Sequence, residues 1–423
     1  MLVRTFVLGC WQGALLLMAL FSLAGAAEAQ KETPAPEIAP ADVLKYFAGD
    51  WKGTGEVVGF AEWSFTAKTE QEVNGNCILE RRHLTGADFT ADQVALTCWY
   101  PAGAVFRELG AGSGGRRWTA TSSAAKSGEF FVLRGQEEGS TDSGVATAEK
   151  QWLQVLDKDH FVAYFWDRKT GDDTLADAIV AYTRQDAEGA VDAAAIVRKM
   201  LGEMLEKDPG NVTALRGRGM LLAALGEYEA AAKDLAGVLA LAPEDHWTWY
   251  VLSPLLRTLN REAYLAHCTR MRERFDPADP VVYGRALQAC LLDSNSVKDW
   301  QQLAKEAEDV FLRSPVRMKN SRSAMVGLAR YRCGEFKEAT QWLRWACEAQ
   351  QDTPEAVKSL LTLAAAHAKL GEKDEANKAL RLGTEMLERT FPVRRDGRSR
   401  LRWHDWLICS LIRQEAESLL ANK

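Results

Sequence analysis

The chain has 423 residues and a formal net charge of −6, with 47% hydrophobic and 26% charged residues. This length suits two or three domains rather than one core, and the charge balance provides no basic field for nucleic acid. The composition is that of a globular protein, which excludes collagen, a coiled-coil rod and a polytopic membrane protein.

Residues 1–29 have the features of a secretory signal peptide. Arg4 supplies the positive start, residues 13–26 are uncharged and mostly apolar, and residues 27–29 fit the small-x-small cleavage rule. Because this apolar stretch is shorter than the roughly 20 residues that span a bilayer, cleavage is favoured over an uncleaved anchor. We therefore expect a periplasmic or secreted protein with no membrane span after cleavage, in which residues 30–41 form a proline-rich tether.

Residues 42–185 are predicted to form an antiparallel β-barrel. Between Glu62 and Val73 apolar and polar residues alternate with the period of a strand that has one wet face. About ten such short runs follow one another, separated by turns rich in Gly, Asp and Ser. Closure of these strands into a barrel removes both exposed edges. A Gly-x-Gly-x-x-Gly pattern at 110–115 precedes strand-like sequence, so it indicates a hairpin loop and not a dinucleotide site.

The first predicted strand carries a local signature. Residues 49–55, Gly-Asp-Trp-Lys-Gly-Thr-Gly, resemble the opening of lipocalin-like (calycin) barrels, and look closest to the nitrobindin-like and related bacterial families of unknown function. The resemblance implies a small hydrophobic ligand, or haem bound through a histidine. Only His83 and His160 lie in this segment and neither matches a haem-ligand motif, so no cofactor is predicted. Its six tryptophans either line a cavity or fill the barrel, and a filled core is the favoured interpretation.

Cysteine usage indicates at most a few disulfides and no metal site. Removal of the signal peptide leaves seven cysteines, with no Cys/His cluster at zinc spacing. Cys77 and Cys98 are equidistant from a loop centre between residues 87 and 88, so they would lie opposite each other on adjacent strands. Because export permits oxidation, we hypothesise a disulfide between them, with two buried thiols as the alternative.

Residues 190–392 are predicted to be a helical-repeat array. Pro209, Pro243 and Pro277 recur at intervals of 34 residues, which is the tetratricopeptide period. Small residues stand at matching offsets, with Gly219 and Gly327 where the two helices of a repeat approach each other. The array resembles tetratricopeptide repeats, including those of bacterial kinases and WD-repeat proteins, although the kinase loops are absent from this chain.

The tetratricopeptide resemblance implies a concave groove that binds a protein or peptide partner. Carried onto this chain, the groove positions of two successive repeats are Arg216, Met220, Trp247, Tyr250 and Arg257. The resemblance also implies that capture of a C-terminal carboxylate is doubtful, because Met220 stands at a position where that clamp has Asn. Packing of the aromatic residues inside a degenerate repeat is the alternative to a peptide groove.

Residues 393–423 are predicted to be a basic loop and a helix, 403–421, that caps the solenoid. Patterning changes from strand to helix at 185–191, so we expect fragments 42–185 and 190–423 to melt separately.

No recognisable hydrolase, nucleotide or zinc-protease motif occurs in the sequence. The leading hypothesis is an exported, non-enzymatic interaction protein: a tetratricopeptide platform for a protein or peptide, fused to a barrel of unknown ligand. The alternative is a protein that holds a small lipid- or haem-like molecule in the barrel and uses the repeats only for docking. A hydrolase with its site in the barrel is a third, less favoured hypothesis.

Overall fold

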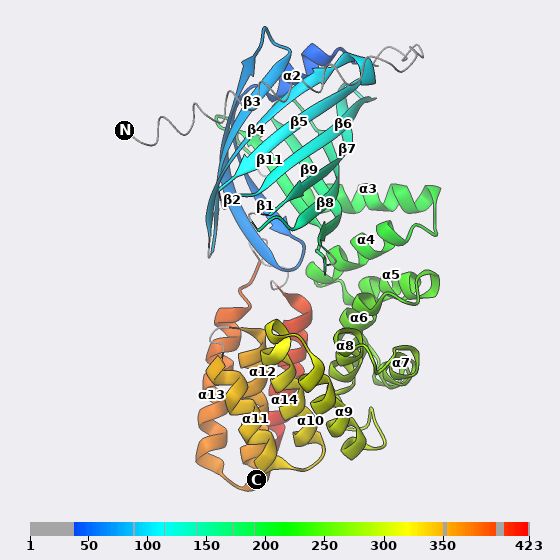
Figure 1. Cartoon of the computed structure of the whole chain (residues 1–423), viewed down its shortest axis with the longest axis vertical. Coiled ribbons are helices and arrows are strands. Elements are labelled where there is room, and N and C mark those ends of the chain that lie inside the picture. Colours follow the sequence, from blue (N-terminus) through cyan, green and yellow to red (C-terminus); the bar gives the residue numbers. More distant parts are fainter. Residues whose placement is uncertain are drawn as a thin grey trace.

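The computed structural model describes residues 38–87, 89–113, 115–141, 143–171, 173–189, 191–349, 353–394 and 402–421. The predicted signal peptide, most of the tether and residues 395–401 of the predicted basic loop lie outside these residues. A barrel stands at one end of the molecule and a curved array of helices at the other (Figure 1).

Ten antiparallel strands close the barrel, which confirms the predicted architecture of a β-barrel followed by an α-solenoid. The strands are β1 (Gly49–Val57), β2 (Ala61–Glu72), β3 (Cys77–Gly86), β4 (Thr90–Tyr100), β5 (Val105–Gly112), β6 (Arg117–Ser127), β7 (Phe130–Ser140), β8 (Ala146–Val155), β9 (His160–Thr170) and β11 (Ala178–Arg184). Each strand pairs with its sequence neighbour; β8 pairs with β9, and β11 pairs with both β9 and β1. The two-residue β10 (Asp173–Thr174) pairs with β9. The glycine pattern at 110–115 lies in the β5–β6 hairpin, as predicted.

The Gly-Asp-Trp-Lys-Gly-Thr-Gly signature on β1 makes room for large side chains. A Cβ at Gly53 would lie 2.0 Å from the carbonyl oxygen of Ala181 on β11 and 2.6 Å from the ring of Phe65. One at Gly55 would lie 2.1 Å from the indole of Trp63. Both rings project from β2, which pairs with β1. Glycine is therefore required on β1, because a neighbouring backbone and two aromatic rings occupy the space of a side chain.

A short helix, α2 (Pro40–Phe47), closes one end of the barrel. Val43 and Leu44 are each 1% exposed, and they join a core inside the barrel that includes Trp51 and Phe161. The Trp51 indole N–H donates to the carbonyl of Phe47 at 2.9 Å, and this bond ties the helix to β1. The opposite end of the barrel has no such plug among the described residues.

The rest of the chain forms helices in antiparallel pairs. They are α3 (Ala193–Lys207), α4 (Val212–Ala224), α5 (Tyr228–Leu241), α6 (His246–Leu259), α7 (Arg261–Arg274), α8 (Pro280–Cys290), α9 (Trp300–Arg313), α10 (Lys319–Arg332), α11 (Phe336–Ala349), α12 (Pro354–Leu370), α13 (Lys373–Thr390) and α14 (Trp403–Ala421). Gly226, Gly334 and Gly371 lie in the turns between paired helices with φ near +80°, a conformation that glycine adopts without strain. Among the described helices, none is long and apolar enough to cross a membrane.

The barrel and the array share a continuous hydrophobic cluster. Helices α3 and α4 pack on the outer face of β9 and β11, where Val162 and Ile179 join residues of both helices. Tyr164 reaches α4 so closely that a Cβ at Gly217 would lie 2.5 Å from its hydroxyl oxygen. This shared core connects the two parts more closely than the short polar junction at 185–191 led us to expect.

A second contact joins the barrel to the C-terminal part of the chain. The turn between β1 and β2 rests on the start of α14, where the ring of Phe60 lies 5.3 Å from that of His404. Glu56 forms a buried ion pair with Arg394. Arg394 is therefore not part of an exposed basic loop, as the sequence suggested, but a buried link to the barrel.

Candidate functional site

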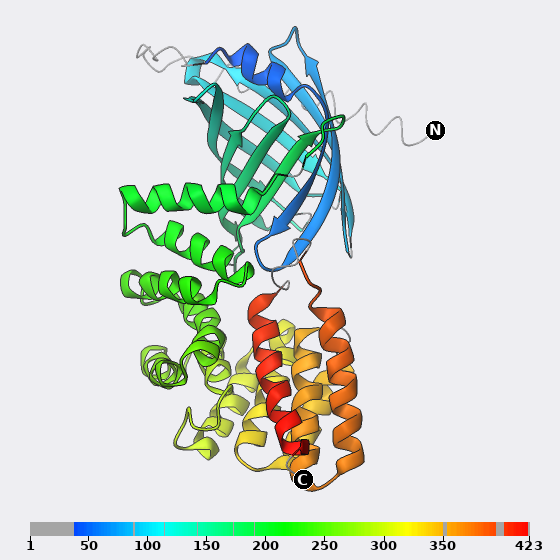
Figure 2. The same ribbon diagram turned by 180° about the vertical axis from the view of Figure 1, so that it is seen from behind.

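The helix α14 covers the face of the array on which the peptide groove was predicted. It packs against α6, α12 and α13 and lies between the two arms of the array (Figure 2). We call this surface, formed by α6, α10 and α12, the inner face. The predicted capping helix therefore lies along the array as well as against its last helices.

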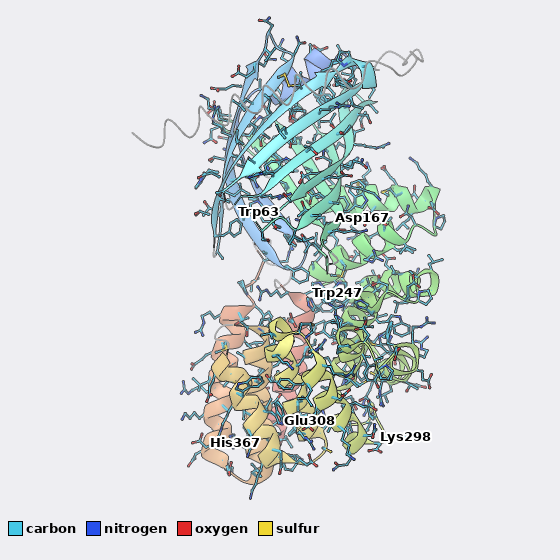
Figure 3. All side chains as sticks on the ribbon, in the orientation of Figure 1. Trp63, Asp167, Trp247, Lys298, Glu308 and His367 are labelled. Carbon is cyan, nitrogen blue, oxygen red and sulfur yellow. A yellow bond between two sulfur atoms is a disulfide. The ribbon has the colours of Figure 1, made fainter. Side chains whose placement is uncertain are left out.

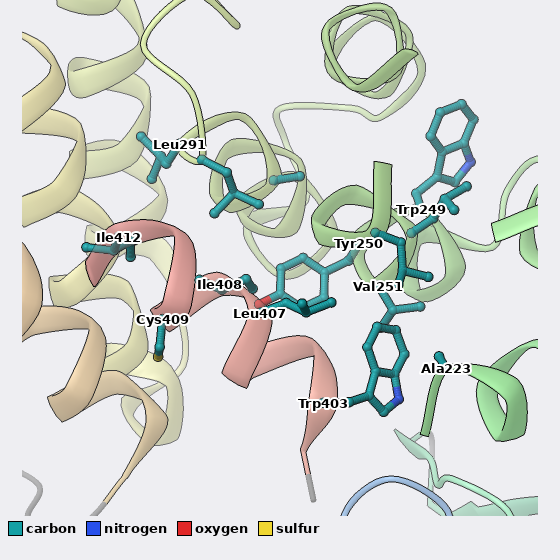
Figure 4. Close-up of a cluster of buried hydrophobic side chains, with 14 of the residues drawn as sticks. Ala223, Trp249, Tyr250, Val251, Leu291, Trp403, Leu407, Ile408, Cys409 and Ile412 are labelled. Carbon is teal, nitrogen blue, oxygen red and sulfur yellow. The ribbon is translucent and has the colours of Figure 1, made fainter. Parts of the chain in front are cut away.

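Buried apolar side chains of α14 make most of this contact. They are Trp403, Leu407, Ile408, Cys409 and Ile412, each at most 5% exposed. Figure 4 shows Trp403 and Leu407 beside Val251 and Tyr250. Cys409 points the other way, and its thiol donates to the carbonyl of Pro354 in α12. Because Leu407, Ile408 and Cys409 follow one another, these side chains point to more than one side of the helix. The first half of α14 is therefore buried between several neighbouring helices.

Two ion pairs fix α14 on the inner face. Lys358 of α12 lies 3.1 Å from the Asp405 carboxylate. Arg332 of α10 makes a two-pronged pair with Glu415, at 2.5 and 2.7 Å. Although burial opposes ionisation, the hydrogen bonds from Arg332 and Tyr331 hold the pKa of Glu415 below its usual value. Paired charges of this kind set the register of a helix in its groove.

The structure brings together two of the five predicted groove residues. The rings of Trp247 and Tyr250 lie 5.7 Å apart, and both contact His404 of α14, at 5.6 and 6.3 Å. Trp247 lies where the barrel meets the array (Figure 3). Met220 is buried on α4 with 7% of its surface exposed.

The two predicted groove arginines make ion pairs within the array. Arg216 lies 2.7 Å from Asp245, which caps the N-terminus of α6. Arg257 lies 3.0 Å from Asp293, which follows α8. Both residues therefore tie successive helix pairs together.

The barrel is not completely filled, contrary to the favoured interpretation of its tryptophans. It encloses a cavity of about 370 Å³ whose lining includes Trp63 and Trp118 but not Trp51, Trp152 or Trp166. Trp51 packs against α2, and Trp152 packs toward the array. Phe89, at the end away from α2, is a lining residue that is 44% exposed.

Neither histidine of the barrel lines this cavity. His83 is exposed and pairs with Asp92 at 2.7 Å on the outer surface, and His160 pairs with Asp157 at 2.9 Å. Within the described residues, no group of three His, Cys, Asp or Glu side chains is arranged to hold a metal ion. The lining therefore offers no histidine for the haem that the barrel resemblance implied.

Charged residues, which the sequence pattern did not assign to the interior, line much of the cavity. They are Glu80, Arg82, Glu108, Arg116, Glu137, Glu149 and Arg168. Arg82 bonds to Glu80, Arg116 lies 2.6 Å from Glu137 and Arg168 lies 2.8 Å from Glu149. Burial and the nearby Glu149 carboxylate raise the pKa of Glu137 to about 7. The interior thus combines apolar walls with paired charges.

Cys77 and Cys98 are direct partners in the register of β3 and β4. In the structure their sulfur atoms are joined as a disulfide. Formation of this bond in the exported protein stays a prediction. The other described cysteines are free thiols, at 268, 290, 333, 347 and 409.

The fold and the two candidate sites define a closed β-barrel fused to an α-solenoid. No protein-family model and no curated protein matches the chain. Part of the chain is similar to the crystal structure of Rv2717c from M. tuberculosis, with 13% identity and a TM-score of 0.30 over 35% of this chain and 99% of that chain.

Two other solved structures are similar to nearly half of the chain. Yeast Tom70 has 18% identity and a TM-score of 0.31 over 48% of this chain. The structure of Naa15/Naa10 bound to HypK-THB has 19% identity and a TM-score of 0.25 over 47%. The matches span only 40% and 31% of those two chains. A function for the present chain therefore has to be argued from its own residues.

Proposed function

We propose that this chain is an exported, non-enzymatic interaction protein whose tetratricopeptide-like array binds an amphipathic helix of a protein partner on the inner face. The observation that supports the proposal is α14 itself, a helix that already lies there with its apolar side chains buried. Export is supported by the signal-like residues 1–29. In this proposal the partner helix replaces all or part of α14.

The inner face has the properties of a helix-binding groove. Helix-in-groove recognition uses an apolar stripe at helical spacing, with polar contacts that fix orientation. Tyr250 and Trp247 supply aromatic surface, a residue type that dominates interface energies. Arg332 and Lys358 supply the polar contacts, which favour a partner helix with acidic residues near both ends of its apolar stripe.

The experiment compares the wild-type chain with a variant whose α14 is held less tightly. Ile412→Ala and Glu415→Ala together remove a buried side chain and an ion-pair partner while leaving the inner face intact. The probe is a fluorescent peptide of residues 402–421, and the control is the same peptide with Leu407 and Ile408 changed to Ser. We expect the variant to bind the probe at least about tenfold more tightly than wild type, and neither chain to bind the control.

The same variant then serves to find the partner. The immobilised variant is incubated with an envelope extract, and the proteins that it retains are then challenged with the 402–421 peptide. Proteins that the peptide releases bind at the inner face. Retention that the peptide does not affect would place recognition elsewhere on the molecule. A folded variant that fails to bind the peptide would show that the inner face is only an internal packing surface.

A further inference from the structure

One carboxylate in the barrel cavity differs from the others in its partners. Each of the three lining arginines is matched to a different glutamate, and Glu108 is left over. Its two oxygens accept hydrogen bonds from the Trp118 indole at 2.7 Å and the Thr97 hydroxyl at 3.0 Å. Within the described part of the chain, no Lys or Arg nitrogen makes a salt bridge with Glu108. It is thus a buried acid held by two neutral donors.

A buried carboxylate without a cation in direct contact is costly, because its charge has lost water. The nearest positive charge is that of Arg82, which bonds to Glu80 and lowers the pKa of Glu108 less than burial raises it. Consistent with this, burial raises the pKa of Glu108 above its usual value. An ionised carboxylate has about four acceptor positions, and the protein fills two of them. The remaining positions can accept hydrogen bonds from a group that enters the cavity.

The surroundings of Glu108 are suited to an apolar body attached to that group. Phe106 lies two residues away on the same face of β5, and Ala120 is the direct partner of Glu108 on β6. Phe65 and Val180 form further apolar wall. The volume of about 370 Å³ is at the lower end of the range for small-molecule sites.

We propose that the barrel cavity binds a small amphipathic primary amine, with its ammonium group on the Glu108 carboxylate and its hydrocarbon body against Phe106 and Ala120. An ammonium group supplies a positive charge in direct contact with Glu108 and up to three donors. An anionic head group is disfavoured because every lining guanidinium is already paired. The inference is independent of the proposed function, since it concerns the barrel interior and not the inner face.

The test is calorimetric titration of the full chain with n-octylamine, 1-octanol and octanoate, which share a hydrocarbon body and differ in the head group. We expect n-octylamine to bind in a one-to-one complex, at least about tenfold more tightly than either of the others. Equal affinity for 1-octanol would show that Glu108 does not recognise the head group. Tighter binding of octanoate would overturn the proposal.

Variants then locate the site. Glu108→Gln keeps the shape and should weaken n-octylamine binding at least about tenfold, with little change for 1-octanol. The matched control is Glu138→Gln, on an exposed position of β7, which should change neither affinity. If Glu108→Gln does not fold, Ala120→Leu fills the cavity without changing a charge, and it should abolish binding of both compounds. Unchanged n-octylamine binding in either folded variant would refute the site.

Discussion

The buried indole of Trp403 should be one of the largest single contributors to the stability of the chain. Trp403, the first residue of α14, is 0% exposed, and a Cβ at Gly59 in the β1–β2 turn would lie 2.7 Å from its indole and 3.7 Å from the methyl group of Ala224 in α4. The indole therefore holds the start of α14 where the barrel meets the first repeat. We predict that Trp403→Ala weakens this junction.

The magnitude follows from the area that the indole buries. A buried aromatic side chain removes roughly 150–250 Å² from water, and about 25 cal/mol per Å² converts this to about 4–6 kcal/mol. Measured losses for Trp→Ala in protein cores are about 3–5 kcal/mol. We therefore expect Trp403→Ala to lower the free energy of unfolding by about 4 kcal/mol, a large part of the roughly 5–15 kcal/mol of a typical protein.

The assay is urea denaturation followed by circular dichroism, with Trp345→Ala as the control. Trp345 lies on α11 and is 41% exposed, so its loss should be only about six-tenths as large. Hydrogen exchange should show weaker amide protection in β1 and β2 as well as in α14, because Trp403 joins them. Equal losses for the two variants, or protection lost only in α14, would refute the reasoning.

The remaining predictions concern the barrel and its junction. Arg394→Met leaves Glu56 buried without its cation and should cost about 3–5 kcal/mol, whereas adding Glu56→Gln should recover part of the loss; urea denaturation of both variants measures this, and additive losses would contradict the coupling. Because the pKa of Glu137 is raised to about 7, its protonated form stabilises the folded state at pH 4.5, and this contribution is lost as the pH rises toward 7. Glu137→Gln should therefore gain stability relative to wild type across that range in urea titrations at several pH values, and a constant difference would contradict the assignment. The unreduced mature protein should have no free thiol at Cys77 or Cys98 by mass spectrometry, and replacing both by Ala should cost about 3 kcal/mol; free thiols at both positions would show that the bond does not form.

Much of the fold could be predicted because two periodicities are strong in this chain. Alternation along 62–72 places Phe65 and Ala67 inside and Lys68 outside, as the structure has them. Val73 follows the same alternation in the sequence, yet it lies in the turn and is 66% exposed. A pattern identifies strands well, but the residue at which a strand ends depends on the turn geometry.

The charged interior of the barrel could not be predicted by the same rule. Alternation assigns charged residues to the solvent-exposed face of a strand. Glu108 and Glu137 instead line the interior, which the rule allows only where the interior itself is polar. The inner wall of a barrel with a cavity is such a surface. The pairing of Arg116 with Glu137 joins residues that are 21 positions apart, so no local spacing reveals it.

The position of α14 on the inner face also could not be predicted from local sequence patterns. Its apolar residues predict a buried helix, but not which surfaces cover it. Arg332 and Glu415 are 83 positions apart, and only the curvature of the array brings them together. The repeat period predicts the curvature in general, whereas the choice of α14 as occupant depends on tertiary contacts.

The contacts of α14 also limit how a partner can replace it. Releasing the whole helix would give up the Trp403 contacts, about 4 kcal/mol, which corresponds to roughly a thousandfold weaker apparent affinity for any competitor. The segment after Trp403 costs less to release toward its C-terminal end, because the ion pair of Glu415 is partly exposed. We therefore expect exchange to begin at the C-terminal end of α14, with Trp403 still held beneath the β1–β2 turn, so that partner binding leaves the barrel attached to the array.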